Sequence, residues 1–180
     1  MSKIGKQPIN LPDAVKAEIL ADSVKVSGPK GEVSVAIPSL LKVSLAENIL
    51  AVSRLKETRQ SKASHGTIRS LLANAVLGVS SGWTKELKIV GTGYRAEMIG
   101  KDLSVKVGFS HPVVMVPPEG IVFTVADDKI TVLGINKELV GNAAAKIRRI
   151  KKVDPYKGKG IRYAGEVIKL KQTKTAKIGG

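Results

Sequence analysis

The chain has 180 residues, of which 43% are hydrophobic, so it can bury the core of one medium domain or two small ones. Its 30 Lys and Arg residues outnumber its 15 Asp and Glu residues, and the formal charge of +15 points to a polyanionic partner. The absence of cysteine excludes disulfides and thiolate metal sites. No apolar run is long enough for a membrane span, and residues 1–12 hold no signal-peptide core, so we expect a cytoplasmic protein.

The first half reads as short strands followed by one helix. Residues 15–20 and 23–27 alternate between apolar and polar, Gly28-Pro29-Lys30-Gly31 is a hairpin turn, and the alternation resumes until Pro38 ends it. A second hairpin is predicted around Glu47-Asn48.

After Thr58 the apolar period changes to that of a helix. Its apolar face is predicted to contain Ile68, Leu71, Leu72, Ala75 and Val76. Thr58 or Ser61 is the expected N-cap, and Gly78 the residue that follows the helix C-terminus. His65 lies on this helix. Because the chain has no cysteine and only one other histidine, we interpret His65 as a polar or hydrogen-bonded residue rather than a metal ligand.

The second half repeats this order after a Ser80-Ser81-Gly82 break. Ala17-Glu18 recurs as Ala96-Glu97 and Val24-Lys25-Val26 as Val105-Lys106-Val107, an offset of about 80 residues that indicates a duplication. Its helix is predicted to begin near Asn136, an N-cap residue. The apolar face of that helix comprises Leu139, Val140, Ala143, Ala144, Ile147 and Ile150.

The sequence therefore predicts an α+β fold of two tandem duplicated domains, residues 1–82 and 83–180. Each is expected to be a small antiparallel sheet packed against one helix. Residues 166–170 favour one further strand, and residues 171–180 form a basic tail that should be disordered on its own.

Positive charge is concentrated at the C-terminus. Residues 1–82 carry a net +5 and residues 83–145 a net charge of zero, whereas residues 146–180 carry 12 cations against Asp154 and Glu166. Within them, Asp154-Pro155-Tyr156-Lys157-Gly158-Lys159-Gly160-Ile161-Arg162-Tyr163 combines cations for phosphates, tyrosines that can stack on bases, and glycines that let the backbone come close. The alternative for this stretch is a basic surface turn with both tyrosines packed on the sheet.

The predicted nucleic-acid contacts all lie in this C-terminal part. They are Arg148, Arg149, Lys151, Lys152, Tyr156, Lys157, Gly158, Lys159, Gly160, Arg162, Tyr163, Lys169, Lys171 and Lys174.

A motif typical of dinucleotide sites is present without its structural context. Gly91-Thr92-Gly93-Tyr94-Arg95-Ala96 matches G-x-G-x-x-A, but residues 94–107 continue in strand-like alternation where a helix should receive the pyrophosphate. We interpret Gly91 and Gly93 as glycines at a strand bend or bulge. No complete nucleophile–base set is visible, so we expect no catalysis, no cofactor and no metal.

The stretch from Asp154 to Tyr163 resembles the signature of bacterial-type large-subunit ribosomal protein six, the uL6 family. Gly91–Ala96 and Gly108-Phe109-Ser110-His111-Pro112-Val113 also look like blocks of that family. The resemblance covers essentially the whole chain, including its length and duplication.

This resemblance implies two tandem α+β domains in a structural component of the large ribosomal subunit. It also implies binding to large-subunit rRNA, mainly by the C-terminal domain, near the sarcin–ricin loop and the stalk base where translation factors dock. Neighbouring large-subunit proteins are expected there, and neither a membrane nor a homo-oligomer is. Two rival readings stay open: a DNA-binding or architectural protein, and a nucleotide-dependent enzyme built on Gly91–Ala96.

Overall fold

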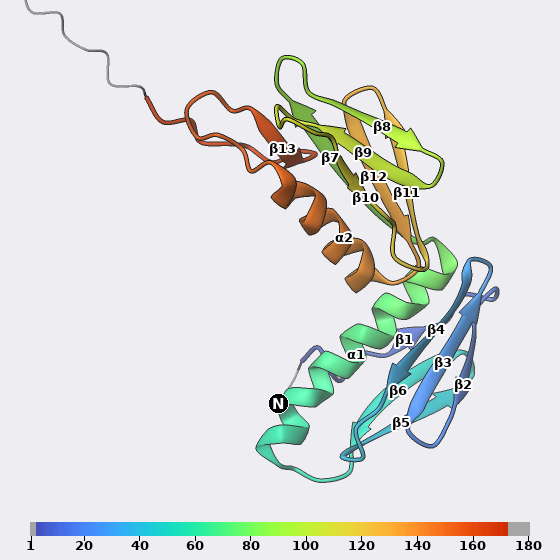
Figure 1. Cartoon of the computed structure of the whole chain (residues 1–180). Coiled ribbons are helices and arrows are strands. Elements are labelled where there is room, and N and C mark those ends of the chain that lie inside the picture. The colour runs from blue at the N-terminus through green and yellow to red at the C-terminus, as the bar shows by residue number, and fades with distance from the viewer. Residues whose placement is uncertain (1–2, 173–180) are drawn as a thin grey trace, which may run out of the picture. The chain divides into compact units, whose positions relative to one another are not determined.

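The computed structural model describes residues 3–172 and confirms the predicted α+β class, with two helices and four small antiparallel sheets in that part of the chain (Figure 1). Contacts divide the chain into two compact units. The first combines the residues up to Trp83 with Gly134–Glu138, and the second combines Thr84–Leu133 with the residues from Leu139 onward. Neither helix in the described part is long and apolar enough to cross a membrane.

The first unit contains two three-stranded sheets and one helix. One sheet has the order β2-β3-β4 and the other β1-β6-β5. The elements are β1 (Ile9–Asn10), β2 (Lys16–Ile19), β3 (Ser23–Gly28), β4 (Gly31–Ala36), β5 (Leu41–Ala46), β6 (Ile49–Arg54) and α1 (Arg59–Ser80).

Helix α1 contacts strands of both sheets, and one core forms between them. The apolar residues of the period-2 strands meet the period-3.6 face of the helix there, with Val24, Leu50 and Leu72 fully buried. Both predicted hairpins are present. Glu47 and Asn48 adopt positive φ angles of 47° and 63°, as a two-residue hairpin turn requires.

Two local predictions about α1 are confirmed and two are wrong. Thr58 is the N-cap and exchanges hydrogen bonds with Ser61, and the His65 ring donates from Nε2 to the Val52 carbonyl at 2.9 Å. Gly78, however, lies inside the helix rather than after it. The structure gives another reason for glycine at this position, since a β-carbon there would lie 2.1 Å from the Ile135 carbonyl oxygen. Leu71 is 43% exposed although it shares the period of the apolar face.

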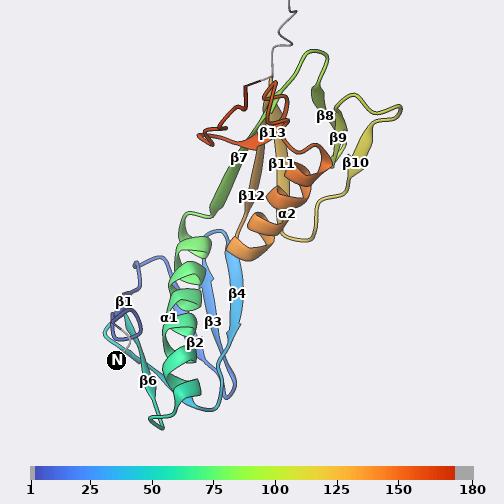
Figure 2. The same ribbon diagram turned by 90° about the vertical axis from the view of Figure 1, so that its left-hand side faces the viewer.

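The second unit contains a sheet of order β10-β9-β8, a sheet of order β11-β12-β7-β13, and α2 alongside them (Figure 2). The elements are β7 (Trp83–Val90), β8 (Arg95–Ile99), β9 (Asp102–Lys106), β10 (Val113–Met115), β11 (Ile121–Ala126), β12 (Lys129–Gly134), α2 (Lys137–Ile150) and β13 (Gly160–Tyr163).

Helix α2 begins directly after Asn136, the residue predicted as its N-cap. The Asn136 Oδ1 atom accepts the Glu138 N–H at 2.9 Å, and the helix buries Val140, Ala143, Ala144 and Ile147. Leu139 is 39% exposed, so the apolar face is narrower than predicted. The strand expected over residues 166–170 does not form. The chain there has no strand partner and instead returns to the preceding turn, where the Lys171 N–H donates to the Pro155 carbonyl at 2.8 Å.

Candidate nucleic-acid interface

Residues 146–172, here called the basic segment, run from the last turns of α2 through a tight turn and β13 to the end of the described chain. They contain ten Lys and Arg residues and two acids, Asp154 and Glu166. Folding so many like charges together is unfavourable unless local contacts hold the backbone, and both acids supply such contacts.

Asp154 holds the turn in place. Its carboxylate accepts the backbone N–H groups of Lys157 at 2.9 Å and Tyr156 at 3.2 Å. Its own backbone closes the loop, with the N–H donating to the Lys159 carbonyl and the C=O accepting the Gly158 N–H. The hydrogen bonds from Lys157 and then Tyr156 lower the pKa of Asp154 below its usual 3.8, so the carboxylate stays ionised. This turn presents Tyr156 and Lys157 to solvent, since both side chains are exposed.

The two glycines of the stretch have different roles. Gly158 has φ +69°, and a β-carbon there would lie 3.3 Å from Leu170. Gly160 is buried with φ +146°, and its β-carbon would lie 2.7 Å from the Val153 Cα and 2.8 Å from the Lys152 carbonyl oxygen. Glycine at position 160 therefore lets the start of β13 pack against the backbone that follows α2. This packing within the protein explains the glycine without any contact to RNA.

Arg148 and Tyr163 are held by contacts within the second unit. Arg148 donates to both carboxylate oxygens of Glu166, at 3.2 Å from Nε and 2.5 Å from Nη2, and its guanidinium lies 5.5 Å from the Tyr163 ring centroid. Glu166 also accepts the Tyr163 N–H at 3.0 Å. The Arg148 hydrogen bond lowers the pKa of Glu166 and, reciprocally, raises the pKa of Arg148. Arg148 thus serves mainly to hold the segment after β13 in place, and its charge is already paired with Glu166.

Two other cations reach loops from earlier in the chain. Lys151 lies 4.9 Å from the Phe109 ring centroid, and the Lys159 Nζ atom lies 3.4 Å from the Thr92 hydroxyl. The loops after β7 and after β9 therefore join the basic segment at one surface. Phe109 is 46% exposed, an unusual position for a large aromatic side chain.

Phe109 and Thr92 were not among the predicted contacts. The signal that could have identified them is their position in Gly91–Ala96 and Gly108–Val113, the two blocks that resemble the same family as the Asp154–Tyr163 stretch. Sequence spacing alone does not bring those blocks to residues 151–159.

The remaining predicted contacts divide by exposure. Five of them are exposed and form no ion pair with another described residue: Arg149, Lys152, Lys157, Lys169 and Lys171. Arg162, in contrast, is half-buried on β13. Strand β13 pairs antiparallel with β7, which buries Ile161 completely and turns Arg162 toward the opposite face, beside Lys88. Lys174 lies outside the described residues.

The Gly91–Ala96 motif was predicted as a strand bend or bulge, and in the structure residues 91–94 form a bend and turn that connect β7 to β8. Gly91 has φ +157°, the Tyr94 N–H donates back to its carbonyl, and the Tyr94 ring would lie 2.6 Å from a β-carbon at Gly91. Strand β8 follows, where a dinucleotide site would need a helix. Residues 3–172 contain no group of three or more His, Cys, Asp or Glu side chains arranged to hold a metal.

Comparison with known proteins identifies the family. The model of the family "Ribosomal protein L6" matches residues 11–82 and 90–164. The large ribosomal subunit protein uL6 of Prochlorococcus marinus (strain MIT 9211) is 52% identical over 178 residues, covering 98% of this chain and 99% of the relative.

Other organisms carry similar chains. The uL6 protein of Syntrophomonas wolfei is 51% identical over 181 residues, covering 100% of this chain and 99% of the relative, and that of Persephonella marina is 49% identical over 176 residues, covering 97% and 98%. These matches extend across both units and include the Asp154–Tyr163 stretch. The chain therefore belongs to the ribosomal protein L6 (uL6) family.

Proposed function

We propose that this protein is a structural, non-catalytic component of the large ribosomal subunit in the cytoplasm, and that it binds large-subunit rRNA through the basic segment. The observation that carries this proposal is the ordered Asp154 turn, which presents Lys157 and neighbouring cations on a fixed backbone, in a chain similar to uL6 proteins over nearly its whole length. On the basis of the family resemblance, we further propose that the rRNA site lies near the sarcin–ricin loop and the stalk base, beside neighbouring large-subunit proteins and the translation-factor region.

Affinity in this interface comes mainly from phosphates. Exposed Lys and Arg side chains that bind phosphates displace counterions condensed on the RNA, and this gain in affinity depends little on the RNA sequence. Selectivity for RNA comes from shape, because A-form helices show 2′-hydroxyls in a shallow groove, and from stacking on exposed rings such as Tyr156. If about six cations meet phosphates, log K should fall with log salt at a slope of roughly −4 to −5.

The test uses the full chain and an rRNA fragment that contains the sarcin–ricin loop, titrated at several salt concentrations. Replacing Lys157 and Lys159 by Ala should reduce the magnitude of the salt slope by about one to two. The matched control is Lys101→Ala, because Lys101 is an exposed cation in the turn between β8 and β9, at the end of β8 opposite the Thr92 loop. It should leave the slope nearly unchanged.

Arg148 and Arg149 offer a second comparison on one helical turn. Arg149→Ala should weaken rRNA binding with little change in thermal stability, since Arg149 is exposed. Arg148→Ala should lower the stability of the second unit, because it leaves Glu166 without its partner.

Two outcomes would contradict the proposal. Unchanged rRNA affinity in the Lys157/Lys159 variant, with the fold intact, would show that the basic segment is a solvated surface. Equal binding to duplex DNA at the same salt would favour the DNA-binding alternative instead.

A further inference from the structure

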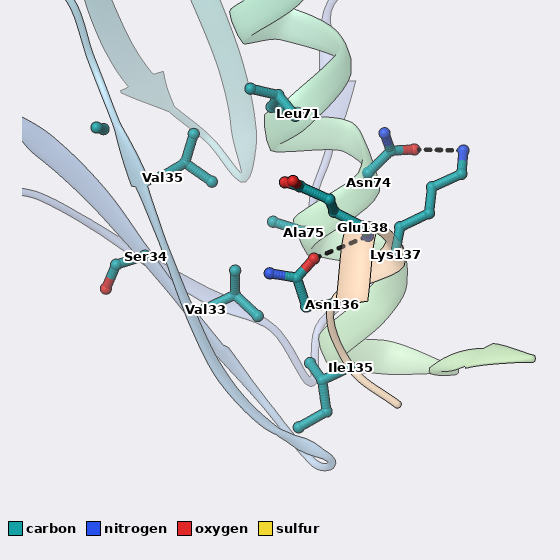
Figure 3. A pocket seen from close by; sticks show the side chains of 11 residues that line it. Val33, Ser34, Val35, Leu71, Asn74, Ala75, Ile135, Asn136, Lys137 and Glu138 are labelled. Carbon is teal, nitrogen blue, oxygen red and sulfur yellow. Dashed lines mark hydrogen bonds between the residues drawn. The ribbon is translucent and has the colours of Figure 1, made fainter. Parts of the chain in front are cut away.

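The first unit contains a groove between strand β4 and helix α1, with a volume of about 420 Å³ (Figure 3). It shares no residue with the basic segment, since all of its lining residues belong to the first unit. We call it the β4 groove. Its lining residues are Val33, Ser34, Val35, Ala36, Leu71, Asn74, Ala75, Ile135, Asn136, Lys137 and Glu138.

One wall of the groove is the free edge of a sheet. Among the described residues β4 has only β3 as a strand partner. The Ile37 N–H donates to the Asp22 carbonyl, in register with the pairing of β3 and β4. Hydrogen-bonded and non-hydrogen-bonded residue pairs alternate along an antiparallel pair of strands. The backbones of residues 33, 35 and 37 are therefore the ones that hydrogen-bond to the β3 side. The backbone N–H and C=O groups of Ser34 and Ala36 therefore point away from β3, toward the groove that these residues line.

The groove also has an apolar surface on α1 and on the inward face of β4. Leu71 and Ala75 of α1 face Val33 and Val35 across the groove, and Leu71 is 43% exposed (Figure 3). Ile135 packs against Gly31 at one end, where a β-carbon on the glycine would lie 2.7 Å from Ile135 Cδ1. An extended segment placed beside β4 would thus pair its backbone with a strand edge and its alternate side chains with an apolar surface.

The charge of the lining favours a basic residue in that segment. Glu138 is the one acid among the lining residues, it is exposed, and no ion pair forms with it within 4.0 Å in the described part of the chain. Lys137 beside it is already engaged, with its ammonium 3.1 Å from Asn74 Oδ1 and 4.4 Å from the Trp83 ring centroid. A polyanion would meet a carboxylate and an apolar wall here, so the groove does not suit RNA.

We propose that the β4 groove docks an extended protein segment with apolar side chains at alternate positions and a Lys or Arg that reaches Glu138. The segment adds to β4 as a further strand, and Ser34 and Ala36 supply the main-chain pairing. This gives the first unit a protein partner, independent of RNA binding by the basic segment.

The probe is an acetylated hexapeptide with valine at alternate positions and one lysine, titrated into the full chain. Trp83 is the only tryptophan, and its indole N–H donates to the carbonyl of groove-lining Asn74 at 3.0 Å, so its fluorescence reports binding. Amide resonances of Ser34 and Ala36 should shift and their hydrogen exchange should slow. A peptide N-methylated on the pairing side should not bind, because it lacks the donors.

Two substitutions test the two parts of the proposal. Ala36→Pro removes an edge N–H without removing a bond to β3 and should weaken peptide binding about tenfold, whereas Ala36→Ser keeps the N–H and should bind normally. Glu138→Lys should weaken the lysine peptide about two- to fivefold and strengthen a glutamate peptide by a similar factor. Far-UV circular dichroism and the unfolding midpoint check that each variant folds.

The readouts separate this proposal from rRNA binding. Ala36→Pro should leave rRNA affinity and its salt slope unchanged, and Lys157→Ala should leave peptide binding unchanged. Absence of any Ser34 or Ala36 shift at millimolar peptide would overturn the proposal. So would peptide binding that Ala36→Pro leaves intact. A chain that sediments as a dimer, and becomes monomeric with Ala36→Pro, would show that the occupant is a second copy instead.

Discussion

Replacing Gly160 by Ala separates two explanations for a glycine in the middle of a basic loop. One explanation is that the bare backbone must approach a phosphate. The structure supports another, because a β-carbon at Gly160 would lie 2.7 Å from the Val153 Cα and 2.8 Å from the Lys152 carbonyl oxygen. Both neighbours are backbone atoms and cannot move by changing a rotamer. The substitution should therefore displace β13 from β7 or from the end of α2.

The expected magnitude follows from two contributions. A side chain at φ +146° costs about 1–3 kcal/mol in backbone strain. The clash with packed backbone adds about 1–3 kcal/mol, as other overpacked sites do. Gly160→Ala should then destabilise the second unit by about 2–6 kcal/mol, a large part of the 5–15 kcal/mol by which domains are stable.

Gly120→Ala is the matched control, since Gly120 has φ +75° and a β-carbon there meets nothing within 4 Å. It should cost only about 1–2 kcal/mol. Hydrogen exchange of peptides from β7 and β13, compared with peptides from β5 and β6, locates the destabilisation in one unit. If Gly160→Ala costs no more than Gly120→Ala, the steric reasoning is wrong. If it leaves stability intact but lowers rRNA affinity, the glycine serves the RNA.

Two further sites in the first unit, Gly78 and Thr58, test helix packing and helix capping. Gly78→Ala should destabilise the first unit by at least about 2 kcal/mol, because the new β-carbon would lie 2.1 Å from the Ile135 carbonyl oxygen. Gly141→Ala in α2 is the control and should stabilise the protein by about 0.5–1 kcal/mol, because a β-carbon there meets nothing within 4 Å. Urea unfolding measures both changes, and equal effects would contradict the Ile135 contact. Thr58→Ala should cost about 1 kcal/mol in the same assay through loss of the α1 N-cap, and Thr58→Ser should restore most of it.

Features that depend on neighbouring residues were predictable from the sequence. The hairpins at Gly28–Gly31 and Glu47-Asn48 follow from period-2 patterns and turn chemistry. The N-caps at Thr58 and Asn136 were predictable because each side chain accepts a hydrogen bond from a backbone amide only two or three residues later in the chain. The helix that a dinucleotide site would need was correctly excluded, because the alternation after Gly93 is that of a strand.

Features that depend on distant contacts were not predictable. Gly78 reads as a helix terminator because its reason for being glycine, the Ile135 carbonyl, comes from the second half of the chain. Leu71 has the period of the core but faces the β4 groove. Arg148 carries the same charge as Arg149, and only the return of Glu166 shows that it is engaged within the protein.

The two acids of the basic segment make its stability depend on acid pH. Asp154 binds the backbone amides of Lys157 and Tyr156, and Glu166 binds Arg148 and the Tyr163 amide, so both pKa values lie below their usual 3.8 and 4.5. A carboxyl group with a lower pKa in the folded state contributes stability above the unfolded pKa, and this contribution is lost as pH falls through the folded pKa. The second unit should therefore begin to lose stability as pH falls below about 4.5, while the Lys and Arg side chains that we propose bind rRNA stay charged.

Glu166→Gln tests this dependence directly. The glutamine cannot titrate, so the part of the acid-induced loss that comes from residue 166 should vanish, although the variant is less stable at neutral pH because Arg148 loses its ionised partner. The measurement is the urea midpoint of the second unit, followed by exchange of β13 peptides between about pH 6 and pH 3. An unchanged pH profile in both Glu166→Gln and Asp154→Asn would mean that neither carboxylate holds the segment. The order of the basic segment would then have to come from β13 and its pairing with β7 alone.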